Sequence, residues 1–507
     1  MLLLRRHWPV VVLLLALWGT RIAALDALPL HNDEGLHLTR AVAVWDGHPF
    51  WDISDGKIIN HWLIALFYPQ YAPVFAARIA TVLVALPGLA AAYALACRLT
   101  GRSGGLLAGI LWLLTPYLFF YERLAQSDVQ AGALALVALW GAYQLSVTGR
   151  LRDAILTGLV LAAAGLFKIS AAPFALSVAI VILLGERLPL RQRISSLLII
   201  AAIGAACLAV PLLYLVLRRG AVFGVALGWV GGSGAFFSGA GANLAALTAL
   251  TAGETAVIAG PVVAIGLAGL LTIRAGMRRR AALLLAAGLL PLAAILLLAR
   301  TVEARHFGVA VPAALALAGA GWGALLGRLP ARVAALRWMA GLLLIGLLAA
   351  GFVPFAAIAY RDPGSLPLPS AVARQYLTDH SAGFGLREAV QALPQTVGVP
   401  DAPIIAAMFG DSCRRANFYA ASGYALQCPD YPGTAAVQAA LAAGGPVYVL
   451  EDTLLPGFNP LELGGGLAVI ARYARPGEPA DGGSVVLWRL DNEVIPSPVC
   501  LPCEMPR

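Results

Sequence analysis

Long apolar stretches separated by short charged clusters dominate the first 360 residues of the chain. A transmembrane helix needs about 20 mostly apolar residues, and about eleven windows approach that length. They begin near Trp8, Val74, Gly104, Val129, Ala154, Ala171, Ser195, Thr255, Ala281, Phe307 and Trp338. The pattern predicts an α-helical polytopic membrane protein. The mean hydropathy of +0.82 and a charged fraction of only 12% agree with it.

The first apolar window, MLLLRRHWPVVVLLLALWGTRIAAL, has a basic start, as a cleaved signal peptide also would. However, no small-x-small cleavage site leads from it into a soluble domain, and the run reaches spanning length. We therefore interpret it as a retained first helix.

Arginine positions predict the orientation of these helices. With a cytoplasmic N-terminus, the cytoplasmic connections hold 16 basic residues and only two acids, Asp153 and Glu186. Such a bias is what the positive-inside rule requires. We therefore expect a multi-pass protein of the inner or plasma membrane. The basic residues are Arg5, Arg6, Arg98, Arg102, Arg150, Arg152, Arg187, Arg191, Arg193, Arg274, Arg278, Arg279, Arg280, Arg328, Arg332 and Arg337.

The other connections are then predicted to face the outside. They comprise a long first loop at residues 26–72, turns near residues 122–128, 168 and 300–306, and a Gly-rich loop at residues 217–253. Within the Gly-rich loop, residues 228–243 combine glycines with aromatic residues. This composition fits either a plain linker or a lid that closes over a bound substrate.

The composition changes after Tyr360. The segments APIIAAMF, GPVYVLED, LAVIARYA and GSVVLWRL are typical of short strands, and TAAVQAALAA is typical of a helix. We therefore predict a transmembrane module at residues 1–360 and a small exported α/β domain at residues 361–507.

The net charge of +9 divides unequally between these parts. Residues 1–360 hold 26 Lys and Arg against 12 Asp and Glu, whereas residues 361–507 hold 9 against 14. The basic excess thus belongs to the membrane part, where topology explains it. No nucleic-acid partner is expected.

Four of the six cysteines fall in the tail, where an exported location permits disulfides. We favour the pairs Cys413–Cys428 and Cys500–Cys503. The second pair could instead be half of a metal site, but the sequence has no further pair at a suitable spacing.

Acidic residues on the predicted outer face are candidates for catalysis. LPLHNDEGLHL places Asp33 and Glu34 at the start of the first outer loop, where a carboxylate could take a proton from a polar acceptor. Adjacent acids could also simply end a helix in water. Asp128, in YERLAQSD, lies at the next outer turn, where capping a helix is the simpler role.

Cations lie on the same predicted face. Lys168 interrupts the apolar run GLFKISAAPF, and a lysine at a helix centre would cost about 2.5–3.5 kcal/mol. We therefore expect it at an outer turn or facing an anion. Arg305 and His306 occupy another outer turn, where arginines also commonly snorkel. Acids and cations on one face suit a lipid substrate with a phosphate at headgroup level, because Arg and Lys bind phosphate.

In this order, the motifs resemble the GT-C membrane glycosyltransferases, in the branch of protein O-mannosyltransferases and lipid A aminoarabinose transferases (glycosyltransferase family 39-like). The resemblance covers roughly Trp8 to Gly327 and rests on the DE pair of the first loop, YERLAQSDVQAGALAL, GLFKISAAPF and EARHFGVAVPAAL.

The resemblance implies roles for individual residues. Asp33 corresponds to the proposed catalytic base, Glu34 to its neighbour and Asp128 to the second-loop acid. Lys168 and Arg305 correspond to the lysine and arginine that bind the donor phosphate. His306, which stands where the family often has tyrosine, is assigned to the phosphate too. Lys57, in KIINHWL, is assigned to the phosphate as well, although the family often has Lys-Pro-Pro-Leu there.

The resemblance also implies the reaction. A sugar would pass, with inversion, from a polyprenyl-phosphate donor to a hydroxyl of a lipid, glycan or protein acceptor on the outer face. One direct displacement needs a single base. No cofactor is required, and a divalent metal at the acidic cluster stays an option. The alternative is a polytopic transporter or a lipid or glycan flippase. That reading predicts midplane charges and internal repeats, and the sequence offers neither clearly.

Overall fold

The computed structural model describes residues 2–50, 57–67, 72–185, 187–219, 237–329, 334–408, 410–430, 433–454, 466–477 and 483–491. It divides into two compact units. The membrane unit comprises Met1–Ala27 and Arg40–Pro369, and the tail unit comprises Leu28–Thr39 and Ser370–Arg507. The division after residue 369 lies nine residues beyond the predicted boundary, because one helix and a short 3-10 turn continue past Tyr360. The grouping of residues 28–39 with the tail was not predicted.

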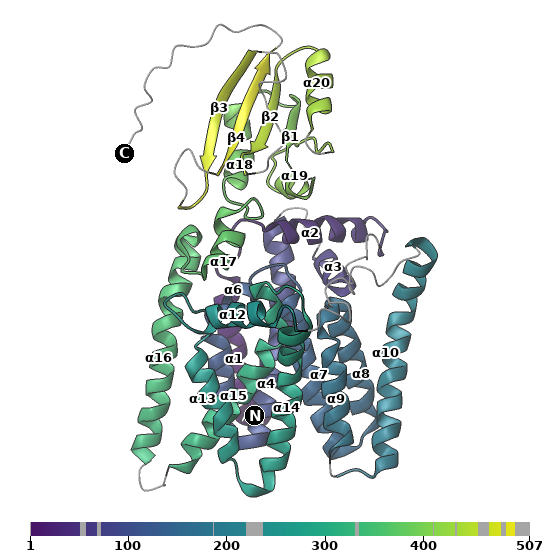
Figure 1. Ribbon diagram of the computed structural model, residues 1–507, viewed down its shortest axis with the longest axis vertical. Helices are drawn as coiled ribbons and strands as arrows, with labels where there is room; N and C mark the ends of the chain where they lie inside the picture. The colour runs from purple at the N-terminus through teal and green to yellow at the C-terminus, as the bar shows by residue number, and fades with distance from the viewer. Residues whose placement is uncertain are drawn as a thin grey trace. The chain divides into compact units, whose positions relative to one another are not determined.

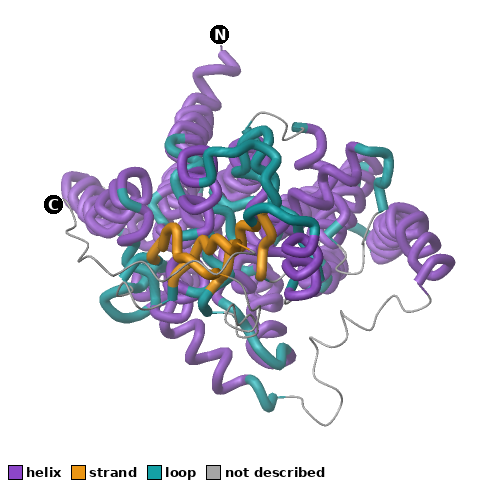
Figure 2. Tube along the Cα trace, turned by 90° about the horizontal axis from the view of Figure 1, so that it is seen from above, coloured by secondary structure: helices purple, strands orange, loops and turns teal. Residues whose placement is uncertain are grey.

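Helices make up the membrane unit (Figures 1 and 2). In chain order they are α1 (Leu2–Ile22), α3 (Ile58–Leu66), α4 (Pro73–Thr100), α5 (Arg102–Leu113), α6 (Pro116–Glu122), α7 (Asp128–Thr148), α8 (Leu151–Phe167), α9 (Pro173–Leu183), α10 (Leu190–Arg219), α12 (Ala240–Thr251), α13 (Gly260–Gly269), α14 (Ala275–Leu298), α15 (Val311–Arg328) and α16 (Ala334–Arg361). The 3-10 segments η2 (Ile169–Ala171), η3 (Leu270–Thr272), η4 (Ala304–Val309) and η6 (Pro363–Ser365) also belong to it.

Every apolar window predicted from the sequence falls on a helix of this unit. Among the described residues, six helices are long and apolar enough to cross a membrane, namely α4, α7, α10, α14, α15 and α16. A seventh span results if α5 and α6, bent by 62° at their junction, count as one. The multi-pass character is therefore confirmed, whereas the number of eleven spans stays a prediction.

Two segments predicted as outer loops contain helices. The first loop, at residues 26–72, holds α2 (Asn32–Trp45) and α3. The Gly-rich loop holds α12, a helix that the sequence did not predict; the amide of Asn243 donates to the carbonyls of Leu296 and Ala299 at 3.2 and 2.8 Å and ties this segment to α14. More than half of the candidate lid, residues 228–236, lies outside the described residues.

Small residues allow the helices around α15 to approach closely. Gly319 and Gly323, one turn apart on α15, face Ala108 and Gly104 of α5, and a Cβ on Gly323 would lie 2.5 Å from the Gly104 Cα. Without a hydrophobic force between helices in lipid, such close backbone packing is what holds them together. These contacts explain why Gly and Ala fill the interior of the unit.

Two arginines connect the end of α1 to the turn after α6. The Arg21 Nε donates to a Glu122 carboxylate oxygen at 2.8 Å, and both side chains are fully buried. Arg123 donates to the carbonyls of Ala23 and Ala24 at 2.9 and 2.6 Å. Arg123, the arginine of YERLAQSD, therefore caps the end of α1, and it fixes the turn that leads to Asp128.

The tail unit contains one four-stranded sheet with the order β1-β2-β4-β3 (Figure 1). Its strands are β1 (Ile404–Ala407), β2 (Val447–Asp452), β3 (Gly466–Ala474) and β4 (Ser484–Asp491). The pair β1–β2 is parallel and the other two pairs are antiparallel. All four strands lie in the segments predicted from the sequence.

Helices cover both faces of this sheet. Leu386, Val390 and Leu393 of α18 (Leu386–Thr396) pack in one apolar cluster, and Val437 and Leu441 of α20 (Thr434–Ala442) pack in the other. The unit also holds α17 (Ser370–Ala373), the π-helical turn η7 (Arg374–Thr378) and α19 (Gly410–Asn417). The predicted disulfide Cys413–Cys428 is present. The other predicted pair, Cys500–Cys503, lies outside the described residues.

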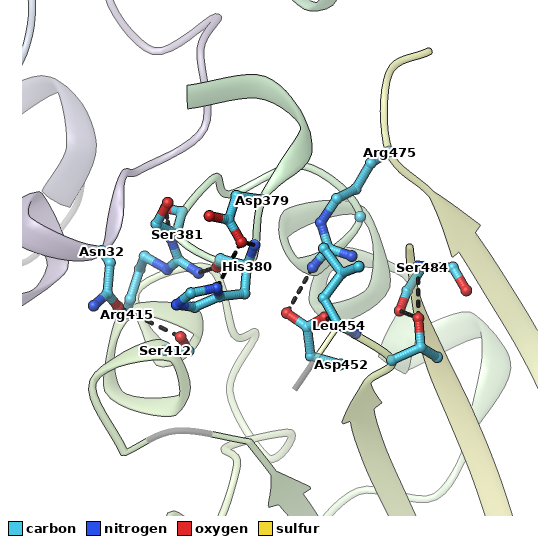
Figure 3. A network of polar contacts seen from close by, with 12 residues as sticks. Asn32, Asp379, His380, Ser381, Ser412, Arg415, Asp452, Leu454, Arg475 and Ser484 are labelled. Carbon is cyan, nitrogen blue, oxygen red and sulfur yellow. Dashed lines mark hydrogen bonds and ion pairs between the residues drawn. The ribbon is translucent and has the colours of Figure 1, made fainter. Parts of the chain in front are cut away.

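Arg415 of α19 attaches residues 28–39 to this unit. Its buried guanidinium donates to the carbonyls of Leu30, Ser381 and His380 at 3.0, 2.5 and 3.1 Å (Figure 3). Burial lowers the pKa of Arg415 to about 10, which leaves it charged at neutral pH. A Cβ on Gly35 would meet the Arg415 side chain, so α2 approaches α19 closely.

Candidate active site

An ion pair between Lys168 and Asp128 joins two helix ends of the membrane unit. Lys168 ends α8 in an extended conformation, and Pro173 begins α9 a few residues later. Its ammonium group contacts the carboxylate of Asp128, the first residue of α7. The side chains are only 14% and 3% exposed, so this lysine lies at a turn and faces an anion, as predicted. Ser127, rather than Asp128, is the N-cap of α7.

The 3-10 turn η4 holds a second set of charges. Glu303 precedes it, and its carboxylate forms an ion pair with the Arg305 Nε at 2.8 Å. The backbone N–H of Glu303 donates to the His306 Nδ1 at 3.1 Å. Because Nδ1 accepts this bond, a neutral His306 carries its proton on Nε2, where it can donate to a ligand.

Two glycines bring η4 against the start of α7. A Cβ on Gly308 would lie 2.7 Å from Val129 Cγ2 and 3.3 Å from the Asp128 Cβ. A Cβ on Gly132, one turn along α7, would collide with the carbonyl of Gly308. Close approach at these two positions therefore keeps the turn of Arg305 and His306 beside Asp128 and Lys168.

Three cations of this region act on His306. Burial lowers the pKa of His306 well below its usual value, and the charges of Lys168, Arg305 and Lys57 lower it further. His306 is therefore neutral at pH 7. Lys57, the N-cap of α3, also acts on Lys168. We call Lys57, Asp128, Lys168, Glu303, Arg305 and His306 the cation cluster.

Buried polar atoms without partners flank the cation cluster. Within the described part of the chain, neither amide atom of Asn60 or Gln130 has a hydrogen-bond partner, and the hydroxyls of Ser127 and Ser170 have none either. Asn60 and Gln130 are 0% and 1% exposed. Each of the four residues lies within three positions of Lys57, Asp128 or Lys168 in the sequence.

The two amides belong to helices that both pack on α8. Gln130 lies eleven residues, or about three turns, before Gly141, so both lie on one face of α7. That face packs on α8, because a Cβ on Gly141 would meet the Thr157 side chain. Asn60 is in the first turn of α3, which packs against α4 and α8. Sequence reasoning missed these polar residues, although they interrupt apolar runs next to the charged motifs.

The acids of the first loop lie in the tail unit, at the start of α2. Glu34 is fully buried, and a carboxylate oxygen of its side chain accepts the backbone N–H of His31 at 3.0 Å. Asp33 is partly exposed, and its backbone N–H donates to the His31 Nδ1 at 3.1 Å. Of the two carboxylates, Asp33 is therefore the more accessible to a substrate.

No group of three or more His, Cys, Asp or Glu side chains that could hold a metal ion occurs among the residues that the structure describes. The two acidic sites predicted from the sequence belong to different units, Asp33 and Glu34 to the tail unit and Asp128 to the membrane unit. Lys168 uses the carboxylate of Asp128, a contact that competes with metal coordination there.

Comparison with known proteins gives a family model that matches part of the chain and solved structures with a similar fold. Residues 55–215 match the family model of dolichyl-phosphate-mannose-protein mannosyltransferase. This region contains Lys57, Asp128 and Lys168, but neither Asp33 nor Arg305. No curated protein matches the chain significantly.

The chain is similar to solved structures of ArnT from Cupriavidus metallidurans. The structure bound to undecaprenyl phosphate has a TM-score of 0.63 at 14% identity, covering 95% of this chain and 98% of that one. The structure of the apo state has a TM-score of 0.62 at 16% identity, with the same coverage of both chains. This chain therefore shares the fold of ArnT.

A third similar structure is the arabinofuranosyltransferase AftD from Mycobacteria. Its TM-score is 0.50 at 16% identity, over 97% of this chain and 40% of that one. The resemblance inferred from the sequence motifs is therefore confirmed for the fold and, over residues 55–215, for the family model.

Proposed function

We propose that this protein transfers a sugar from a polyprenyl-phosphate carrier to an acceptor hydroxyl, with inversion, on the outer face of the membrane. The observation that carries the proposal is the cation cluster of the membrane unit, in which the largely buried side chains of Lys168 and Arg305 lie on neighbouring turns. A largely buried cation in a membrane protein is stabilised by an anion or by water, and the phosphate of a lipid-linked sugar is such an anion.

The charge of the cluster suits the course of this reaction. A sugar phosphodiester carries one negative charge, which Lys168 and Arg305 would bind. As the bond from the sugar C1 to the phosphate oxygen breaks, the leaving polyprenyl phosphate gains a second negative charge. Fixed cations stabilise the transition state because that charge is still developing there. Lys168 and Arg305 supply the charge, Lys57 adds to it, and neutral His306 donates its Nε2–H.

The unpartnered polar atoms support a sugar rather than a phosphate alone. A buried amide without a hydrogen bond costs roughly 2–7 kcal/mol, and sugar hydroxyls both donate and accept. We propose that Asn60 and Gln130 bind hydroxyls of the donor sugar, with Ser127 and Ser170 beside them. Primary amides suit this task since each offers two donors and an acceptor.

The base is proposed to be Asp33. The acceptor oxygen attacks C1 while its proton passes to the Asp33 carboxylate, and polyprenyl phosphate leaves from the opposite side of C1. Glu34, buried and bonded to the His31 backbone, is proposed to hold the start of α2 in place. Asp128 is proposed to position Lys168, rather than to act on substrate.

The relatives support the choice of carrier. ArnT, whose fold this chain shares, was solved with undecaprenyl phosphate bound. The family model matched by residues 55–215 is named for a dolichyl-phosphate-linked mannose donor. The particular sugar and the acceptor are left open by these likenesses.

Binding of undecaprenyl phosphate to the purified full chain tests the phosphate site. We expect Lys168→Ala and Arg305→Ala each to raise its Kd about 10- to 100-fold, the loss of a hydrogen bond to a charged group. Arg191→Ala, which removes an exposed arginine from the predicted cytoplasmic side, is the matched control. Equal Kd values for all three variants would place the phosphate elsewhere.

A further inference from the structure

A cavity of about 580 Å³ lies between α4, α7 and α8, far from the cation cluster. It is lined by the second half of α7, whereas Asp128 begins that helix. At 1.5 Å per residue, Asp128 and Thr148 are about 30 Å apart along the helix axis. The cavity therefore does not belong to the proposed active site, and its volume suits a small ligand or part of a lipid.

One end of this cavity is cationic. It is lined by Arg98 from the end of α4 and by Arg150 and Arg152 from the start of α8. The acidic residue Asp153 also lines this end. Asp153 pairs with Arg152 at 3.5 Å and also accepts from the Thr148 hydroxyl. Within the described residues, Arg98 and Arg150 form no ion pair. The cavity thus keeps two arginines available for an anion.

A polar stripe leads from this end along α7. Trp140, Gln144 and Thr148, spaced four residues apart, share one face of the helix and line the cavity. The indole N–H of Trp140 is a buried donor with no acceptor among the described residues. It can bond an oxygen of a ligand that enters between the helices.

The other end of the cavity is apolar. Val137 of α7 and Leu156 and Val160 of α8 line it, closer to the middle of the helices. A free phosphate would leave these side chains uncovered. An amphiphile with an anionic headgroup and an acyl chain would match both ends at once.

We propose that this cavity binds an anionic phospholipid of the cytoplasmic leaflet. Arg98 and Arg150 contact its phosphate, the Trp140 indole donates to an oxygen near the glycerol, and part of an acyl chain covers Val137 and Val160. The three arginines belong to connections that the positive-inside rule assigns to the cytoplasm. Basic pockets between transmembrane helices on that side are suited to anionic headgroups.

Native mass spectrometry of the delipidated full chain, incubated with phosphatidylglycerol, tests this proposal. We expect the double variant Arg98→Gln/Arg150→Gln to retain about tenfold less of the lipid than the unmodified protein. The control Arg187→Gln/Arg191→Gln removes the same charge from the same predicted face and should retain it within about twofold. Val137→Phe keeps every charge but fills the apolar end, and it should lose the lipid as the first variant does.

Three results would overturn the proposal. An equal loss in the control variant would mean that general surface charge holds the lipid. Equal retention of phosphatidylcholine would remove the role of the anionic headgroup. Displacement by glycerol phosphate, together with full retention in Val137→Phe, would identify a site for small anions only. Melting temperatures of the variants show whether each is folded.

Discussion

Lys168 and Asp128 are forty residues apart in the sequence, yet the lysine ammonium at the end of α8 contacts the aspartate carboxylate at the start of α7. The pair leaves Lys168 held in a fixed position beside the turn that carries Arg305 and His306. We interpret Asp128 as the residue that positions the phosphate-binding lysine.

A double-mutant cycle tests this coupling. Lys168→Ala and Asp128→Ala should each raise the KM for donor, and the double variant should be hardly worse than Lys168→Ala, because Asp128 acts through the lysine. We expect a coupling energy of at least about 1 kcal/mol. Asp128→Asn should weaken donor binding and lower turnover less than Lys168→Ala does, because the lysine remains. Additive effects of the two Ala substitutions would give Asp128 a role of its own in the chemistry.

Close packing between η4 and α7 gives a second prediction. Gly308→Ala places a methyl group 2.7 Å from Val129, which must push the turn away at a cost of roughly 1–3 kcal/mol. We expect a lower melting temperature and weaker binding of undecaprenyl phosphate. Gly165→Ala in α8 has open space around the new methyl group and serves as the control. It should be neutral or slightly stabilising, and a Gly308→Ala variant that behaves the same would argue against close packing at the site.

The lowered pKa of His306 predicts a pH dependence of stability. The unfolded chain takes up a proton near pH 6.5 but the folded chain does not, so the stabilisation is present above that pH and lost as the pH falls. Each pH unit below 6.5 lowers the free energy of unfolding by up to about 1.4 kcal/mol. His306→Gln keeps an acceptor for the Glu303 N–H but does not titrate. Its melting temperature should fall less between pH 7.5 and 5.5 than that of the unmodified protein; parallel curves would contradict the assignment.

Asn60 gives a prediction that separates sugar from phosphate. Asn60→Leu has a similar volume and removes two buried atoms without partners, so we expect a higher melting temperature. The Kd for sugar-free undecaprenyl phosphate should not change, whereas binding of a donor carrying its sugar should weaken by about tenfold, the worth of a hydrogen bond. If both ligands bind the variant as they bind the unmodified protein, Asn60 does not contact the sugar.

Hydrophobic periodicity predicted much of this fold. Each apolar window became a helix, and the four strands of the tail follow its β-branched runs, because burial of apolar residues dominates both patterns. Periodicity could not reveal that Leu28–Thr39 belongs to the tail unit. That association depends on Arg415, which lies nearly 400 positions away and bonds to backbone carbonyls that any sequence would present.

The candidate site was predictable in part for a similar reason. Lys168 and Arg305 attract notice because a charge in an apolar run is costly. Asn60 and Gln130 are costly too, but only once burial without a partner is known, and that is a property of the packed helices. For Arg123 the sequence is misleading in the opposite direction. This arginine belongs to the motif YERLAQSD, yet its contacts show a structural role, because it caps the end of α1.

The most direct test of the account is the transfer of a sugar from a synthetic polyprenyl-phosphate donor by the purified full chain. Turnover is measured as the release of polyprenyl phosphate, for the unmodified protein and for Asp33→Asn. We expect turnover by the unmodified protein and a loss of about two to four orders of magnitude in the variant, the typical contribution of a positioned base, with Kd for undecaprenyl phosphate unchanged. Near-normal turnover by Asp33→Asn would remove Asp33 as the base. No turnover by the unmodified protein with any of a panel of sugars, despite tight binding of undecaprenyl phosphate, would contradict sugar transfer itself.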